Sequence, residues 1–324
     1  MGRVYVPSFY PDFCCIADKC RHSCCIGWEI DIDKDSLERY KRAPGPLGMK
    51  LARMISRSSQ EAPHFLLQGK EERCPFLTDT NLCELILGLG EDYLCQICRD
   101  HPRFRNFYSD REEIGLGLCC EEAARLLLSF EDPIRIVPLE TENTSDEEPL
   151  EPEEEDFFSL RDKLFHLLED RTADLSEKID AIENEVDLPM LSLDYPSLGR
   201  LLMDLERLDP SWENALDLLN TSLSKEAIES FRSCLKDANR EKEYENLLWY
   251  FLYRHLPDGI FDESLPSRVR LATISTRILL YMGAVSYTKN GSFTLSEQVE
   301  LVRMFSSEIE YSEENISSLL AAFA

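Results

Sequence analysis

Apolar residues recur every three or four positions through most of the chain after residue 156, a spacing that predicts a series of amphipathic helices. The predicted helices are Phe157–Leu168, Leu198–Leu208, Trp212–Leu219, Ala227–Leu235, Tyr244–Leu256, Arg268–Met282, Leu295–Phe305 and Glu314–Phe323. No segment beyond residue 130 shows the alternation of a strand, so we expect an all-α arrangement there.

The first 130 residues show shorter elements of both kinds. Alternation predicts strands at Trp28–Ile32, His64–Leu67, Phe104–Tyr108 and Ile114–Leu118. One helix is predicted from Asp33 or Asp35, either of which is a good N-cap, to Arg42. Further helices are predicted at Leu47–Ser58, Leu82–Leu87, Glu91–Cys98 and Glu121–Leu128. The fold class is therefore mainly α, with a cysteine-rich N-terminal unit that contains short strands.

An acidic segment separates the two parts. Glu140–Asp156 reads ETENTSDEEPLEPEEED, which offers too few apolar residues to bury, so we expect an exposed linker. The predicted organisation is a metal-binding domain over residues 1–130, an acidic linker over 131–156 and a helical domain over 157–324. Residues 1–130 hold 17 Lys/Arg and 20 Asp/Glu, whereas the remainder holds 18 and 42, so the acidic excess lies in the second part.

The net charge of −27 excludes several partners. Nucleic acids and anionic membrane surfaces both require clustered Lys and Arg, so neither is an expected partner. The longest apolar stretch, Leu271–Val285, contains Arg277 and is shorter than the roughly 20 residues that span a bilayer. The first residues lack the apolar core of a signal peptide. We therefore expect a soluble, cytoplasmic protein.

Cysteine carries the strongest chemical signal. The spacing is Cys14-Cys15-x4-Cys20-x3-Cys24-Cys25, then Cys74-x8-Cys83, Cys95-x2-Cys98 and Cys119-Cys120, while Cys234 stands alone. Disulfides are disfavoured in a chain without a secretory signal. Zinc is an alternative, although only Cys95 and Cys98 have the CxxC spacing typical of zinc sites. An irregular, all-thiolate set favours an iron–sulfur cluster.

Four segments between Phe13 and Ala123 resemble the flagellin lysine-N-methylase family, in the same order and at similar spacing. They are Phe13-Cys14-Cys15 with Cys20 and Cys24-Cys25-Ile26-Gly27-Trp28-Glu29-Ile30, then Cys74-Pro75-Phe76-Leu77 with Leu82-Cys83-Glu84-Leu85, then Leu94-x3-Cys98-x3-Pro102-Arg103, then Leu116-x-Leu118-x-Cys120-x-Glu122-Ala123. The resemblance implies an S-adenosylmethionine-dependent enzyme that methylates lysine side chains of flagellin and contains a 4Fe–4S cluster.

The same resemblance implies a set of metal ligands: Cys15, Cys20, Cys24, Cys25, Cys74, Cys83, Cys98 and Cys120. These thiols exceed the four that one cubane cluster takes, so either there are two metal sites or some thiols are structural. Cys14, Cys95, Cys119 and Cys234 lie outside the family pattern and are interpreted as thiols without a ligand role. Arg99 and Arg103 flank Cys98 and are candidates for binding a cofactor carboxylate, or for pairing with surface acids.

Other residues have weaker signals. His22 and His101 lie near the ligand candidates and are minor candidates for metal binding. Tyr250, Tyr253 and His255 could line a substrate pocket, but an ordinary core helix explains them better. A glycine-rich nucleotide loop is missing, so a different iron–sulfur enzyme and a non-enzymatic iron- or zinc-binding module remain alternatives to the methylase.

Overall fold

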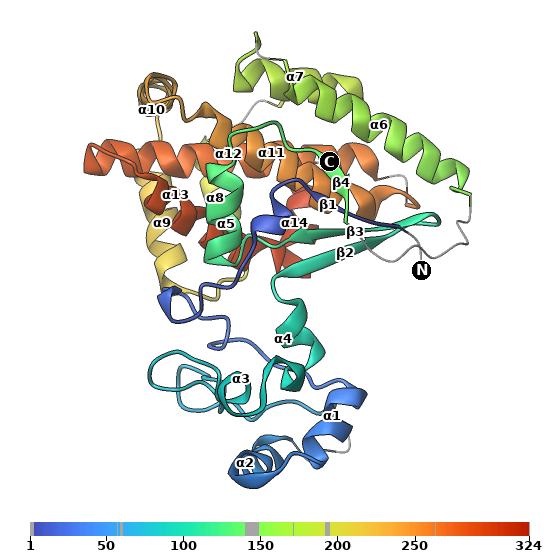
Figure 1. The fold of residues 1–324 in the computed structure, drawn as a ribbon. Helices are drawn as coiled ribbons and strands as arrows, with labels where there is room; N and C mark the ends of the chain where they lie inside the picture. Colours follow the sequence, from blue (N-terminus) through green and yellow to red (C-terminus); the bar gives the residue numbers. More distant parts are fainter. Residues whose placement is uncertain are drawn as a thin grey trace. The chain divides into compact units, whose positions relative to one another are not determined.

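The computed structural model describes residues 3–56, 58, 61–139, 149–170, 172–191, 195–262 and 264–323. The chain divides into two compact units, both drawn in Figure 1. The helical unit consists of Met1–Phe13, Arg105–Cys119 and Ala123–Ala324, and the cysteine-rich unit consists of Cys14–Phe104 and Cys120–Glu122. This division differs from the single boundary predicted near residue 130, because the first strand and the 105–119 segment belong to the helical unit.

Four strands form one sheet in the order β2-β3-β1-β4. They are β1 (Arg3–Pro7), β2 (Arg103–Phe107), β3 (Arg111–Leu116) and β4 (Ile136–Pro138). β1 is parallel to β3, with Tyr5 opposite Glu113, and antiparallel to β4, with Val6 opposite Val137. The predicted strands near residues 104–108 and 114–118 correspond to β2 and β3. The expectation of no strand beyond residue 130 is wrong, since the short β4 pairs with the open edge of β1.

The helices predicted after residue 156 are confirmed, with shifts of a few residues at their ends. The helices from residue 121 onwards are α5 (Glu121–Ser129), α6 (Pro152–Leu168), α7 (Leu175–Glu185), α8 (Tyr195–Asp204), α9 (Pro210–Ser222), α10 (Lys225–Asp237), α11 (Glu241–His255), α12 (Leu265–Asn290), α13 (Leu295–Phe305) and α14 (Glu313–Phe323). A π-helical turn, η5 (Ser306–Glu310), joins α13 to the segment before α14. The sequence analysis missed α7, although its buried residues Leu175, Ile179 and Ile182 have the spacing of one helix face and a capping box of Asp174 and Glu177 marks its start.

Part of the predicted acidic linker is helical. Residues 140–148 lie outside the described part of the chain, but α6 begins at Pro152. Glu151 and Glu154 form a capping box at its start, and acidic side chains in the first turn favour the positive end of the helix dipole. The same acids that disfavour burial therefore support a helix start, which is why the prediction of a linker up to Asp156 is wrong.

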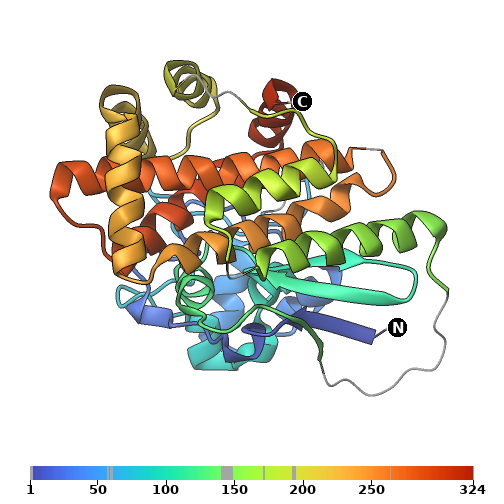
Figure 2. The same cartoon turned by 90° about the horizontal axis from the view of Figure 1, so that it is seen from above.

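Helices α11 and α12 form the centre of the helical unit and lie side by side in Figure 2. Both are buried on most of their circumference, as expected for helices enclosed by others. Gly283 of α12 allows a close approach, because a Cβ there would lie 2.7 Å from the Tyr244 hydroxyl and 2.9 Å from the Phe231 ring. None of the described helices is long and apolar enough to cross a membrane.

The cysteine-rich unit is built from short elements. They are α1 (Lys34–Lys41), α2 (Gly45–Met54), α3 (Glu84–Leu89) and α4 (Gln96–Asp100), with 3-10 turns at Ala17–Lys19 (η2) and Glu91–Tyr93 (η3). The predicted strands at 28–32 and 64–67 are wrong, since these segments meet only in isolated bridges such as Asp31 with His64. The predicted helix at 91–98 is interrupted at Leu94 and Cys95.

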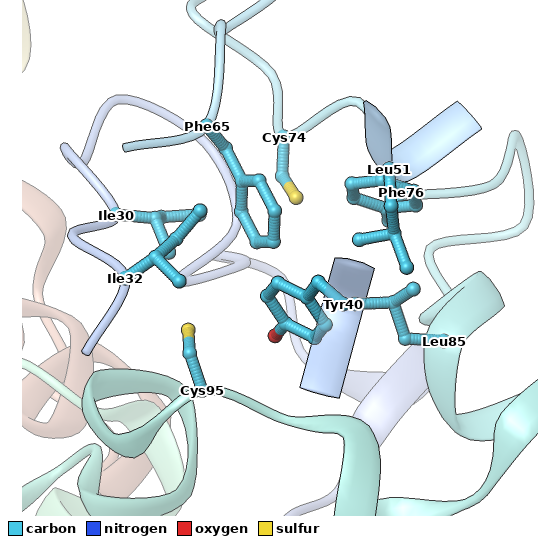
Figure 3. Packing of buried hydrophobic residues seen from close by; sticks show 9 residues of the cluster. All are labelled: Ile30, Ile32, Tyr40, Leu51, Phe65, Cys74, Phe76, Leu85 and Cys95. Atoms are coloured by element: carbon cyan, nitrogen blue, oxygen red, sulfur yellow. The ribbon is translucent and has the colours of Figure 1, made fainter. Parts of the chain in front are cut away.

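The core of this unit is small. It consists of Ile30, Ile32, Tyr40, Leu51, Phe65, Cys74, Phe76, Leu85 and Cys95. Figure 3 shows the side chains of Cys74 and Cys95 pointing in among the aromatic rings. A core of this size gives limited hydrophobic stabilisation to about 90 residues, so additional stabilisation from a bound group is expected.

Candidate metal centre

All eight predicted ligand cysteines lie in the cysteine-rich unit. The unit includes Cys120 through its short second segment, Cys120–Glu122, while Cys119 and Cys234 belong to the helical unit. All twelve cysteines are free thiols. The unit therefore collects the predicted ligands, and it also contains Cys14 and Cys95, which the sequence analysis set aside.

One set of thiols, here called the loop thiol group, consists of Cys15, Cys20, Cys24 and Cys120. The Arg21 backbone N–H and Nε donate to the two carboxylate oxygens of Glu121, at 2.9 and 2.8 Å. The Cys20 Sγ lies 3.8 Å from the same carboxylate. These contacts hold the loop around Cys20 against the segment that carries Cys120.

The thiols of the loop group affect one another electrostatically. Burial raises the pKa of Cys20 to about 11, and the charges of Glu121, Cys120 and Cys15 act in the same direction. A hydrogen bond with Cys25, followed by burial and the charges of Cys25, Cys15 and Cys120, raises the pKa of Cys24. Near pH 7 and without a bound cation these two thiols are therefore protonated, and a bound cation would favour their thiolate forms.

A second set, here called the core thiol group, consists of Cys25, Cys74, Cys83, Cys95 and Cys98. Cys74 and Cys95 are buried in the hydrophobic core, and the other three pack against it. The Sγ atoms of Cys95 and Cys98 are 3.5 Å apart. The sequence analysis set Cys95 aside, and the structure places it in the same core as Cys74 and next to Cys98.

The thiols of the core group also affect one another electrostatically. Burial raises the pKa of Cys74 to about 12, and the charges of Cys25, Cys83 and Cys95 add to the effect. A hydrogen bond between Cys98 and Cys95 lowers the pKa of Cys95 to about 7 and raises that of Cys98. The buried Tyr40 hydroxyl interacts with the Cys95 thiol and helps to lower the pKa of Cys95. Cys95 is therefore engaged by both Tyr40 and Cys98 within the core.

The chemistry of the donor set fits an iron–sulfur cluster, since such clusters are held by cysteine thiolates. Zinc also takes thiolate ligands in CxxC-type pairs, and Cys95 and Cys98 form such a pair with sulfurs 3.5 Å apart. Among the described residues, Glu29, Asp31 and His64 place three possible ligand atoms within 4.8 Å of one another, and this set includes no cysteine.

The predicted cofactor-binding arginines lie together at the end of α4. Arg103 Nη1 donates to the Arg99 carbonyl oxygen at 3.2 Å. Burial lowers the pKa of the intervening His101 to about 4, and the charge of Arg103 acts in the same direction, so this imidazole is neutral near pH 7. His22 is exposed, and its carbonyl oxygen accepts a hydrogen bond from the Cys20 thiol at 3.1 Å.

In the helical unit, the interpretation of Tyr250, Tyr253 and His255 as core residues is confirmed, since all are at most 5% exposed. Sequence reasoning missed the buried Glu310, whose carboxylate accepts hydrogen bonds from Tyr250 at 3.0 and 3.2 Å. His255 Nε2 lies 2.8 Å and Arg254 Nε 3.2 Å from the same carboxylate. These groups satisfy one another, which is typical of a structural polar network.

Comparison with known proteins places the chain in a family. A lysine-N-methylase of Salmonella choleraesuis and one of Salmonella typhimurium are each 25% identical over 162 residues, which covers 48% of this chain and 40% of each relative. The flagellar biosynthetic protein FliU of Salmonella muenchen is 25% identical over 134 residues, 40% of this chain and 79% of that protein.

The matched segment thus spans about two fifths of the length of the two lysine-N-methylases. No solved structure matches the chain. The family model for the FliB lysine N-methylase C-terminal domain matches residues 140–324, which is more than half of the chain. The chain therefore belongs to the FliB lysine N-methylase family.

Proposed function

We propose that the chain methylates lysine side chains of flagellin in the cytoplasm, with S-adenosylmethionine as the methyl donor and a 4Fe–4S cluster in the cysteine-rich unit. The observation that carries the proposal is the match of the lysine N-methylase family model to residues 140–324. The name of the relative FliU supports a flagellar substrate. The gathering of the thiols in one unit supports a metal group.

The net reaction sets out what the protein must provide. The methyl carbon passes from the sulfonium sulfur to the lysine Nζ, the electron pair of the broken S–C bond stays on sulfur, and one amine proton leaves to solvent. The lysine must therefore reach the site neutral, which requires loss of a proton from its ammonium form. When bound, the cluster would supply either an electron or a Lewis-acidic iron close to the methyl donor.

Residues of this chain can be assigned to parts of that task. The thiolates of the eight predicted ligand cysteines would hold iron. Arg99 and Arg103 would bind the carboxylate of the donor, as a guanidinium group does through charge-assisted hydrogen bonds. The excess of Asp and Glu after residue 130 would favour the approach of a lysine-bearing protein surface.

The test uses the full chain, purified and reconstituted without oxygen, reduced, and given S-adenosylmethionine and flagellin. Mass spectrometry should then show lysine-containing flagellin peptides that gain one or more methyl groups. Cys98→Ser should abolish the gain, while Cys234→Ser, a cysteine of the helical unit, should leave it unchanged. A reconstituted chain that contains iron and sulfide but methylates no flagellin lysine would refute the proposal.

A further inference from the structure

We propose that the cysteine-rich unit holds two separate metal groups. One is bound by the loop thiol group, and the second is bound in the hydrophobic core by Cys25, Cys74, Cys83 and Cys98. The inference rests on the proposed function only in taking iron–sulfur chemistry as the reason for the thiols. It adds a second site and gives the two sites different roles.

The adjacent pair Cys24-Cys25 is the point at which the two sets of ligands separate. The two thiols share a hydrogen bond, but Cys24 is exposed on the side of Cys15 and Cys120, whereas Cys25 packs against the hydrophobic core. The Cys74 backbone N–H donates to the Cys25 carbonyl oxygen at 2.8 Å, which holds these two residues together. A single metal site seldom uses two adjacent cysteines as ligands. The adjacent pair Cys24-Cys25 is explained if each cysteine binds a different metal group.

The remaining ligands of the core site come from elements that converge on Cys25. Cys83 precedes α3 and is held by an isolated bridge with Leu77, three residues after Cys74. Cys98 lies on α4, and its sulfur is 3.5 Å from that of Cys95. Cys25, Cys83 and Cys98 all pack against the hydrophobic core that contains Cys74, so the four residues lie around the same core.

Cys95 and Tyr40 are the neighbours of this site rather than its ligands. Cys95 is fully buried and approaches the site through Cys98. The buried Tyr40 hydroxyl interacts with the Cys95 thiol, so Cys95 already has two polar neighbours, Tyr40 and Cys98. Groups that surround the ligands are a general means of tuning a cluster.

The two proposed metal sites differ in solvent exposure, and this difference gives them different roles. Cys15 and Cys24 are exposed, so a metal group bound by the loop thiol group can meet the methyl donor and a protein substrate. The core site lies among buried aliphatic and aromatic side chains, and four thiolates there would be stable only with a bound cation. The loop group is therefore the reactive site, and the core group stabilises the fold of the unit.

The first test measures iron, zinc and acid-labile sulfide per chain in the anaerobically prepared holoprotein. Cys20→Ser removes a loop ligand, Cys83→Ser removes a core ligand, and Cys234→Ser is the control outside the unit. We expect Cys20→Ser to keep about half of the wild-type metal, the Cys20→Ser/Cys83→Ser double variant to keep none, and Cys234→Ser to keep all. Cys95→Ser should also retain the full content.

A second measurement covers the possibility that Cys83→Ser does not fold. The Cys20→Ser holoprotein is treated with iodoacetamide, and the modified cysteines are identified by peptide mass spectrometry. Cys15, Cys24 and Cys120 should react at once, while Cys25, Cys74, Cys83 and Cys98 should react only after a chelator removes the remaining metal. Cys14, which is exposed, should react under both conditions.

Complete loss of metal from Cys20→Ser, or simultaneous alkylation of loop and core thiols, would overturn the inference. Loss of the core metal from Cys95→Ser would overturn the assignment of its four ligands. These outcomes are independent of activity. A chain that methylates flagellin with a single metal group contradicts this inference alone, whereas a chain with two metal groups and no methylation contradicts the proposed function alone.

Discussion

The Asp33 carboxylate accepts a hydrogen bond from the backbone N–H of Gln96, 2.8 Å away, although the two residues are far apart in sequence. Its other oxygen accepts from the Ser36 N–H at 2.9 Å. One side chain therefore caps the first turn of α1 and also the first turn of α4, the helix that carries Cys98. Burial acts to raise the pKa of Asp33, but these backbone N–H groups lower it to about 2.

We expect Asp33→Ala to destabilise the cysteine-rich unit by about 2 kcal/mol, because each lost N-terminal cap costs about 1 kcal/mol. The measurement is denaturant unfolding of the holoprotein, followed by the absorbance of the metal group. Asp35→Ala is the matched control, since Asp35 is exposed on the same helix and caps neither of them. Equal effects of the two substitutions would show that the bond to Gln96 does not contribute.

Asp33 also illustrates what the sequence could and could not reveal. Its role at α1 follows from local chemistry, since an aspartate before an amphipathic stretch is a good N-cap. Its bond to Gln96 depends on tertiary structure and has no local signal. The same holds for β1 and β4, which are short and find their partners across the chain, and for Glu310, whose neighbours lie on α11.

The helical unit was more predictable than the cysteine-rich unit for a physical reason. Long helices bury a regular apolar stripe, so their periodicity is visible in the sequence, as in Leu295–Phe305, which matches α13. The elements of the cysteine-rich unit are short and are joined by turns, and some of its buried positions are cysteines. Its sequence therefore shows no regular apolar stripe. Cys95 has the same residue type and nearly the same spacing as the predicted ligands, so only its tertiary surroundings, beside Cys98 and Tyr40 in the core, can separate its role from theirs.

Arg161 and Glu113 form a buried ion pair that joins α6 to β3, with two N–O contacts of 2.6 and 2.9 Å. Their side chains are 3% and 0% exposed. Removal of one partner leaves an uncompensated buried charge, so Arg161→Met should destabilise the helical unit by about 3–5 kcal/mol. The measurement is the free energy of unfolding from far-UV circular dichroism in denaturant.

The double variant Arg161→Met/Glu113→Leu tests the cause of that loss. It removes both charges and replaces them with apolar side chains, so we expect much of the lost stability to return. A double variant that is as unstable as the sum of the two single variants would show that the pair acts through packing, for example of Arg161 against the Phe158 ring 4.8 Å away.

Removal of the proposed metal should affect the two units differently. Because the core of the cysteine-rich unit is small, chelation of the holoprotein under reducing conditions should expose it to trypsin, first at Lys70 in an exposed turn. The helical unit has an extensive core of its own and should keep its helical circular dichroism. Simultaneous proteolysis of both units at the same chelator concentration would contradict this difference.

The buried Glu310 should make stability depend on pH. Burial acts to raise its pKa, but the Arg254 guanidinium and the hydrogen bond from His255 outweigh that effect and hold the pKa below its ordinary value. Tyr250 and Ser306 are the other groups that face it. The unfolded chain therefore binds a proton more readily than the folded one, so this contribution to stability is present at neutral pH and is lost as the pH falls through the folded pKa.

Glu310→Gln keeps the shape of the side chain but removes its charge, which leaves Arg254 without its partner. We expect a loss of about 3–5 kcal/mol at neutral pH. Because the variant no longer titrates at this position, the difference from wild type should narrow as the pH falls from about 5.5 to about 3, the range in which carboxyl groups titrate. Glu314→Gln, at an exposed position of α14, should change the free energy of unfolding by less than about 0.5 kcal/mol. A difference between wild type and Glu310→Gln that stays constant over this range would show that the carboxylate is not held ionised by Arg254 and His255.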